Sequence, residues 1–190
     1  LANGLPLRKV KDVKVVQLVG GSNYLRNSMK ADEITRIIAS KLNGESYLLY
    51  APSHVNNIET KKMMLSENNI QTVFSQIKQC DVAVIGIGSM SRQATLFQEN
   101  YLSENEYKEL MKEDCVGDIC SRYFNSEGEI VNHKINDIVI GVEIEDLLQI
   151  PLVIGIAGGD YKKASIAGAL KGGFLDVLIT TKDVAEQLVG

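Results

Sequence analysis

Residues 152–162 read Leu152-Val-Ile-Gly-Ile-Ala157-Gly-Gly-Asp-Tyr-Lys162, and residues 163–170 continue with helical character. Such a continuous apolar run is typical of a buried parallel strand, and here a glycine turn and a lysine at the beginning of a helix follow it. The N–H groups of the turn and the positive end of the helix dipole attract an anion, and the lysine adds a full charge. The stretch therefore predicts a site for a phosphate, or a similar anion, on Gly158, Gly159 and Lys162.

Other short apolar runs along the chain share this organisation, because each is followed by a stretch with helical periodicity. The pattern predicts an α/β fold, a parallel-sheet sandwich wrapped by helices, whose strands are covered on both faces. The expected strands are residues 13–18, 47–50, 82–87, 152–157 and 177–180. The expected helices are residues 31–42, 58–66, 70–79, 103–112 and 162–170. Ser103 and Glu106 have the spacing of a capping box at the beginning of one of these helices.

One segment interrupts the alternation of strands and helices. Residues 117–124 and 129–131 have the composition of two short strands, and residues 125–128, Asn-Ser-Glu-Gly, have that of a turn. We expect a β-hairpin with its turn at residues 125–128, inserted in the α/β series. Insertions of this kind often cover the mouth of a site.

Length, charge and composition exclude several classes of protein. A chain of 190 residues suits one domain, and a net charge of -4 gives no basic field that would attract nucleic acid. No apolar run reaches the roughly 18 residues of a membrane helix, and no signal peptide opens the chain, so we expect a cytoplasmic protein with no membrane partner. The three cysteines and two histidines lack the spacing of a metal site or a catalytic triad. We therefore expect no metal, no cofactor and no catalytic residue.

Glycines recur where the expected strands end. Gly20 and Gly21, then Gly86 and Gly88, and then Gly158 and Gly159 each follow an apolar run. Parallel α/β sheets bind ligands beyond the carboxyl ends of their strands, where glycine lets a ligand approach the backbone. Each pair alone is better explained as a tight turn. Three pairs at one edge of a sheet favour a ligand site.

Five polar residues are candidates for that site, and each has an ordinary alternative. Lys162 could bind an anion or be a solvated lysine in the first turn of a helix, where the dipole repels cations. Asp118 could accept hydrogen bonds from sugar hydroxyls or from its own backbone. Arg92 and Arg122 could clamp a phosphate or form surface ion pairs. Gln17 could bind a ligand or an adjacent loop.

Several motifs, taken together and in order, resemble the effector-binding domain of SorC-type sugar-responsive bacterial transcription regulators. They are Gln17-Leu-Val-Gly-Gly21, Tyr50-Ala-Pro-Ser53, residues 80–88, Gly117-Asp118, Gly128, Ala157-Gly-Gly-Asp-Tyr-Lys162, Ile166, Ala169-Leu170 and Asp176-Val-Leu-Ile179. The resemblance covers essentially the whole chain. Residues 115–124, 135–137 and 141–143 are especially similar to the deoxyribonucleoside-responsive branch of Gram-positive bacteria.

The resemblance implies a fold related to the sugar-phosphate isomerases that is used for sensing and not for turnover. The implied effector is a phosphorylated sugar, either deoxyribose 5-phosphate or another sugar phosphate. The resemblance implies that it alters the oligomerisation of the regulator, which would be a homodimer or homotetramer. It would also alter operator DNA binding, which the family carries out with a helix-turn-helix domain. By motif position, effector contacts fall on Gly20, Gly21, Asp118 and Lys162, and the carry-over to Gln17 and Arg92 is less direct. The alternative is an isomerase or lactonase on the same fold, with Asp118 or Glu143 as base.

The sequence departs from the family pattern in three places. The usual first strand with its glycine-threonine phosphate loop precedes Leu1 in family order, as does the DNA-binding segment. We therefore expect residues 1–190 to be an effector domain that is incomplete at its N-terminus. Val19 stands where the deoxyribonucleoside branch can place a lysine, so no Schiff base forms at this position. Thr181 stands where many members have aspartate. Which sugar phosphate binds, and whether it induces or represses, stays open.

Overall fold

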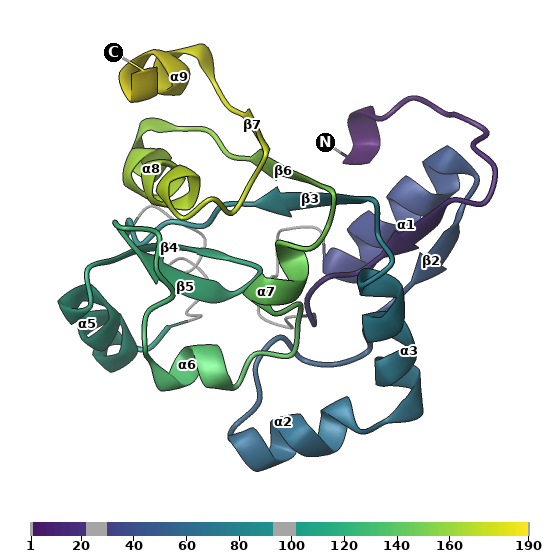
Figure 1. Ribbon diagram of the computed structural model, residues 1–190, viewed down its shortest axis with the longest axis horizontal. Helices are drawn as coiled ribbons and strands as arrows, with labels where there is room; N and C mark the ends of the chain where they lie inside the picture. The colour runs from purple at the N-terminus through teal and green to yellow at the C-terminus, as the bar shows by residue number, and fades with distance from the viewer. Residues whose placement is uncertain (1, 22–29, 93–101, 190) are drawn as a thin grey trace. The chain divides into compact units, whose positions relative to one another are not determined.

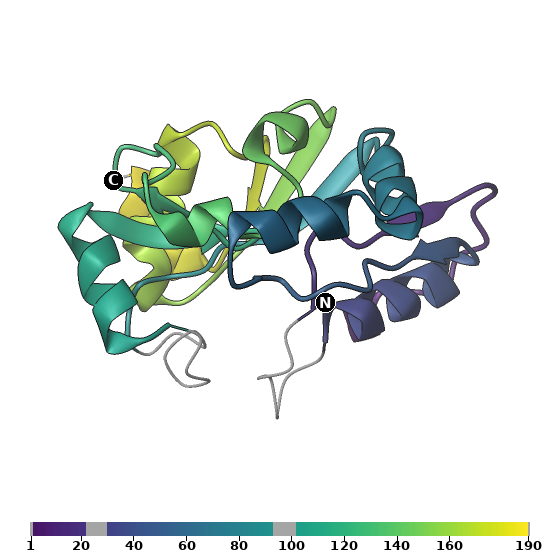
Figure 2. The ribbon, with the colours of Figure 1, turned by 90° about the horizontal axis from the view of Figure 1, so that it is seen from below.

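A computed structural model describes residues 2–21, 30–92 and 102–189, and these form two compact units (Figures 1 and 2). The first unit comprises Leu1–Cys80 and Ile138–Val142, and the second comprises Asp81–Asp137 and Glu143–Gly190. The chain therefore leaves the second unit after Asp137 and re-enters it at Glu143. Among the described residues, no helix is long and apolar enough to cross a membrane.

The first unit is built on two parallel strands. Strands β1 (Lys14–Val16) and β2 (Glu45–Tyr47) pair in parallel, and helix α1 (Ala31–Leu42) packs against both. Helix α1 has the predicted bounds and ends at Asn43, which takes the left-handed conformation and returns its N–H to the last turn. Two further helices, α2 (Ile58–Leu65) and α3 (Asn68–Ile77), and the short 3-10 helix η1 (Ala2–Gly4) complete the unit.

The second expected strand, residues 47–50, is displaced in the structure to Glu45–Tyr47. Pairing begins early because the N–H of Glu45 donates to the carbonyl of Val13 directly after the helix, at 2.9 Å. Pairing ends early because the Gln17 side chain takes over, its Oε1 accepting from the N–H of Leu49 at 3.2 Å. A side-chain amide thus replaces the next rung of the ladder.

A short segment that the sequence analysis did not single out completes the first unit. Ile138–Val142, here called the crossing segment, bonds on one side to Leu18 and Gly20 and on the other to Ser53 and Val55. The four N···O distances lie between 2.8 and 3.1 Å. Its side chains at positions 139, 140 and 142 are fully buried. The segment is therefore firmly integrated in the first unit although the chain on both sides belongs to the second.

The second unit contains a three-stranded parallel sheet in the order β3-β6-β7. Strands β3 (Val82–Gly86), β6 (Leu152–Ile156) and β7 (Val177–Ile179) lie where the apolar runs predict them. The helices of this unit are α5 (Glu104–Lys112), α6 (Lys134–Asp137), α7 (Ile144–Leu147), α8 (Lys163–Lys171) and α9 (Lys182–Val189), with a 3-10 turn, η2 (Asp160–Lys162), before α8. The α/β class and its parallel strands are confirmed.

Only one face of this sheet is covered by the described residues, which corrects the expectation of a sheet covered on both faces. Burial alternates along β3 and β6, with Ala83 and Ile85 buried while Val82 and Val84 are 46% and 47% exposed. Ile179 in β7 lies half exposed on its strand. An unbroken apolar run does not reveal this alternation, because valine and isoleucine occupy both faces.

The hairpin forms, but its turn does not lie at residues 125–128. Strands β4 (Cys115–Ile119) and β5 (Arg122–Asn125) pair antiparallel around a turn at Cys120 and Ser121, with φ of 50° and 66°. Positive φ at two residues matches the twist of a hairpin, but the sequence signal for it is glycine or asparagine, which is absent here. Residues 125–128 form a second turn that leads to a single bridge between Phe124 and Ile130.

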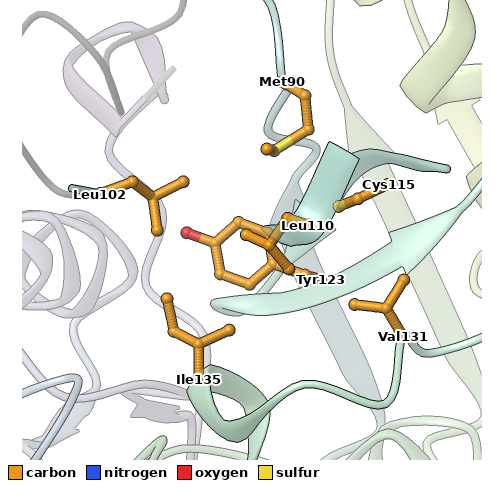
Figure 3. Close-up of a cluster of buried hydrophobic side chains, with 7 residues drawn as sticks. All are labelled: Met90, Leu102, Leu110, Cys115, Tyr123, Val131 and Ile135. Atoms are coloured by element: carbon orange, nitrogen blue, oxygen red, sulfur yellow. The ribbon is translucent and has the colours of Figure 1, made fainter. Parts of the chain in front are cut away.

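A buried apolar cluster holds the hairpin to α5. Figure 3 shows the Tyr123 ring of β5 surrounded by the other members. The cluster comprises Met90, Leu102, Leu110, Cys115, Tyr123, Val131 and Ile135. At the start of α5, Ser103 and Glu106 form the predicted capping box, with both reciprocal hydrogen bonds present. Because Cys115 and Tyr123 of the cluster belong to the two strands of the hairpin, the cluster also helps to fix residues 117 and 118 of β4.

Candidate functional site

Three loops meet at one edge of the β3-β6-β7 sheet because the three strands run parallel. The loop after β6 contains Gly158 and Gly159, and the chain after β7 continues with Thr180 and Thr181. The N–H of Ala157 donates to the carbonyl of Ile179 at 3.1 Å. A methyl group on Gly158 would lie 3.1 Å from Cγ2 of Thr181, so these two loops are in direct contact. This is the edge at which α/β sheets bind ligands.

The hairpin reaches the same edge through the loop after β3. The N–H of Gly88 donates to the carbonyl of Asp118 at 2.8 Å, and Ile87 forms an antiparallel bridge with Ile119. A Cβ on Gly88 would lie 1.7 Å from Oδ1 of Asp118, and a Cβ on Gly117 would lie 2.5 Å from the carbonyl oxygen of Gly88. Glycine at position 88 therefore makes room for a carboxylate of the protein itself.

Lys162 points to the end of β3 and is not a solvated surface lysine. Its Nζ donates to the carbonyl of Ile87 at 2.6 Å, and the side chain is half-buried. Desolvation lowers the pKa of Lys162, and the charge of Asp118 partly opposes this effect. The hydroxyl of Ser89 donates to the carbonyl of Tyr161 at 2.9 Å, which ties the loop after β3 to the turn that carries the lysine.

Asp118 lies close enough to Lys162 for their charges to interact. Burial raises the pKa of Asp118 to about 6, while the N–H of Ser121 and the charge of Lys162 act in the opposite direction. Oδ2 accepts from the N–H of Ser121 at 3.2 Å, so the backbone interpretation of this aspartate is correct. Oδ1 lies over Gly88. A carboxylate beside an ammonium group at a strand end can accept from ligand hydroxyls while the lysine binds an anionic group.

The glycine loop after β6 contains two backbone N–H groups that are candidates to bind an anion. Gly159 has φ of 101°, and its carbonyl accepts from the N–H of Lys162 at 2.9 Å, which closes the turn. Among the residues that the structure describes, no acceptor is recorded for the N–H groups of Gly158 and Gly159. These two donors and the first turn of α8 are the components of the predicted anion site.

Gln17, Gly20 and Gly21 belong to the first unit, and their polar groups are used within it. Gln17 is buried, and its Nε2 donates to the carbonyl of Val19 at 2.7 Å. The N–H of Gly20 donates to Ile140, and that of Gly21 donates to Ala51. The adjacent-loop interpretation of Gln17 is correct. A role of these three residues in effector binding stays a prediction.

The two candidate arginines differ in their surroundings. Arg92 is 65% exposed, pairs with Glu104 at 3.3 Å and lies over the ring of Tyr107. Arg122 is buried; its Nη1 donates to the carbonyl of Asn136 at 2.5 Å, and its Nη2 lies 2.6 Å from a carboxylate oxygen of Glu143. Both arginines have protein partners, so the structure lends the phosphate-clamp interpretation no support. Effector binding by Arg92 stays a prediction.

Thr180 is a polar residue at this edge that the sequence analysis did not identify. Its Oγ1 is buried and has no hydrogen-bond partner within residues 2–21, 30–92 and 102–189. Its position directly after β7 was the one available signal. Within the same ranges, no group of histidine, cysteine, aspartate or glutamate side chains could hold a metal ion.

Comparison with protein families places the whole chain in one of them. Residues 1–190 match the family model described as "Putative sugar-binding domain". The chain is 36% identical over 189 residues to the deoxyribonucleoside regulator of Bacillus subtilis, covering 100% of this chain and 60% of that protein. It is 29% identical over 191 residues to the sorbitol operon regulator of Klebsiella pneumoniae, covering 100% of this chain and 61% of that protein. The chain thus spans about three fifths of the length of these relatives.

Solved structures agree with this assignment. A DeoR family transcriptional regulator from Listeria monocytogenes superposes with a TM-score of 0.91 at 32% identity, covering 99% of this chain and 74% of that one. The full-length sorbitol operon regulator from Klebsiella pneumoniae superposes with a TM-score of 0.94 at 30% identity, covering 100% of this chain and 62% of that one. The resemblance noted in the sequence is therefore confirmed.

Proposed function

Since this chain belongs to the family of sugar-binding domains found in bacterial transcription regulators, we propose that it senses a phosphorylated sugar for the regulator that carries it. The effector would bind one quaternary arrangement of the regulator better than another and so change its affinity for operator DNA. That DNA would be bound by a helix-turn-helix segment outside residues 1–190.

The observation that carries this proposal is the placement of Asp118 near Lys162, the lysine that follows the glycine loop. The Nζ of Lys162 lies against the end of β3, and the N–H groups of Gly158 and Gly159 have no acceptor recorded among the described residues. The phosphate would accept from these N–H groups and from Lys162, and the sugar hydroxyls would donate to Asp118. The anion would also offset the desolvation that lowers the pKa of Lys162.

Deoxyribose 5-phosphate is the first effector to test, because the deoxyribonucleoside regulator of Bacillus subtilis is among the relatives. Binding would be noncovalent at position 19, where valine offers no amine for a Schiff base. The named relatives are regulators, and the alternative base Glu143 pairs with Arg122. The isomerase or lactonase alternative therefore receives no support.

Thermal unfolding with added ligand tests the proposal. Deoxyribose 5-phosphate should raise the melting temperature with dose, by the equivalent of about 2.7 kcal/mol at a hundredfold excess over Kd. Ribose 5-phosphate should give a second, comparable curve, whereas free deoxyribose and inorganic phosphate separate the contributions of the two ends of the ligand. Failure of every sugar phosphate to shift the transition would contradict the proposal.

Lys162→Met should abolish the shift, because the variant keeps the aliphatic stem and loses the charge. Lys163→Met is the matched control, since Lys163 is the exposed neighbour at the first position of α8. The proposed site is wrong if both variants respond like the wild type. If only Lys163→Met loses the rise in melting temperature, the anion binds at Lys163 and not at Lys162.

A further inference from the structure

The crossing segment is connected to the second unit at both ends, and the chain is fixed near both connections. The segment bonds within the first unit through four backbone hydrogen bonds, two on each side. Asn136 lies just before the segment, and Glu143 lies directly after it. Contacts that hold these two residues therefore restrict the movement that the chain can transmit to the segment from either side.

A single buried side chain contacts both of these residues. Arg122 donates from Nη1 to the carbonyl of Asn136, and its Nη2 pairs with Glu143 at 2.6 Å. Asn136 is itself immobilised, because its amide group accepts from the N–H of Tyr123 and donates to the carbonyls of Tyr123 and Val131. A buried guanidinium tolerates the loss of a partner poorly, since the charge would be left desolvated. The two contacts therefore tend to form or break together.

Arg122 is also tied to the candidate effector site. It is the first residue of β5 and pairs with Ile119 across the hairpin, directly after the Cys120–Ser121 turn. That turn is stabilised by Asp118, whose Oδ2 accepts from the N–H of Ser121. A ligand hydroxyl at Asp118 would compete with this N–H for the same carboxylate. Ser121, whose N–H takes part in this competition, directly precedes Arg122 in the chain.

We infer that Arg122 is a positioning residue that links the hairpin carrying Asp118 to the crossing segment through Asn136 and Glu143. The guanidinium holds the chain on both sides of the segment, so a change in the hairpin turn reaches the first unit along the polypeptide. The contacts themselves do not depend on the proposed function. Only the use of the link in effector response rests on the proposed function.

Amide hydrogen exchange tests the link without any ligand. Four amides report on the segment: those of Ile140 and Val142, and those of Gly20 and Val55, which donate to it. Arg122→Met should accelerate their exchange by about tenfold or more while the amides of β3 and β6 keep their rates. Glu143→Gln changes a side chain that is 43% exposed and should give a smaller acceleration of the same amides.

Arg92→Met is the control, because Arg92 also pairs with a glutamate but lies on the surface. It should leave all four amides unchanged. The link is refuted if segment exchange is unchanged in Glu143→Gln and in Arg122→Met, or if all amides of both units accelerate equally, which indicates plain destabilisation. Should Arg122→Met fail to fold, Glu143→Gln alone decides between these outcomes.

Addition of deoxyribose 5-phosphate separates this inference from the proposed function. In the wild type the ligand should change segment exchange, and in Arg122→Met it should still bind, with Kd within about threefold, without changing the segment. If the ligand changes amide exchange in the crossing segment equally in both proteins, Arg122 has no role in the effector response. If no sugar phosphate binds the wild type, the proposed function fails. The amide-exchange comparison without ligand still tests whether Arg122 links the hairpin to the crossing segment.

Discussion

Each unit contains a Gly-Gly pair shortly after a parallel strand, β1 in the first unit and β6 in the second, and the two pairs use their backbone groups differently. In the first unit, Gly20 and Gly21 donate to carbonyls of Ile140 and Ala51. In the second unit, Gly158 and Gly159 have no acceptor recorded among the described residues. Identical dipeptides therefore differ in use, since one completes strand pairing and the other has the donors to which we assign the proposed effector.

The largest effect is expected where the first pair is packed against its neighbour. A Cβ on Gly20 would lie 2.4 Å from the carbonyl oxygen of Pro52, whereas one on Gly21 would meet no described atom within 4 Å. Gly20→Ala should therefore lower the free energy of unfolding by about 3 kcal/mol or more. Gly21→Ala, the matched control, should change it by less than about 1 kcal/mol. Urea unfolding of both variants measures this, and equal losses would show that packing at Pro52 does not distinguish the two glycines.

The second effect concerns Asp118, the carboxylate near Lys162, which follows the Gly158-Gly159 pair. The pKa of Asp118 is about 6 in the folded protein against an ordinary 3.8, so folding binds its proton more tightly. This aspartate favours folding below pH 3.8, and the contribution is lost as pH rises through 6. Asp118→Asn should therefore stabilise the protein above pH 6 by at most about 3 kcal/mol, and the gain should vanish below pH 4.

Unfolding free energies from pH 4 to 8 measure this difference. Asp160→Asn is the control, because Asp160 is an exposed carboxylate in the same loop region. A gain that is constant with pH would mean that the amide packs better and that the charge is not the cause. The same Asp118→Asn variant should lose sugar-phosphate binding, which separates stability from recognition.

The smallest effect on stability is expected at the second pair itself. Gly159 has φ of 101°, a conformation that alanine adopts with strain, so Gly159→Ala should cost about 1–2 kcal/mol. Gly158→Ala should cost less than about 1 kcal/mol, because its nearest described contact, Cγ2 of Thr181, lies at 3.1 Å. Titration calorimetry with deoxyribose 5-phosphate should nevertheless show weaker binding for both. Unchanged affinity in both variants would remove the second pair from the site.

The sequence could predict the parts of the fold that depend on local patterns. Helix α1 has the bounds that its periodicity indicates, and Ser103 with Glu106 forms the capping box that their spacing indicates. The approach of Lys162, which follows β6, to the end of β3 agrees with the rule that the loops after parallel strands meet at one edge. These features can be predicted from the periodicity of a single helix or strand, or from the fact that neighbouring strands run parallel.

The sequence could not predict features whose partners lie far along the chain. The Cys120–Ser121 turn takes positive φ without glycine or asparagine, because Asp118 and the pairing of β4 with β5 stabilise it. The crossing segment reads Ile138-Val-Ile-Gly-Val142, an apolar run like those of the strands, but its partners lie more than 80 residues earlier and it forms only single bridges on each side. The partners of the buried residues Gln17 and Arg122 come from distant positions, which no spacing rule relates to them.

Gly88 has a consequence for how this site can change over generations. Because Oδ1 of Asp118 fills the space of a side chain at position 88, any mutation there that adds a Cβ must displace the acid. Either the Asp118 side chain would have to turn away or a shorter residue, which carries no carboxylate, would have to replace it. We therefore expect that sequences without glycine at position 88 more often lack aspartate at position 118.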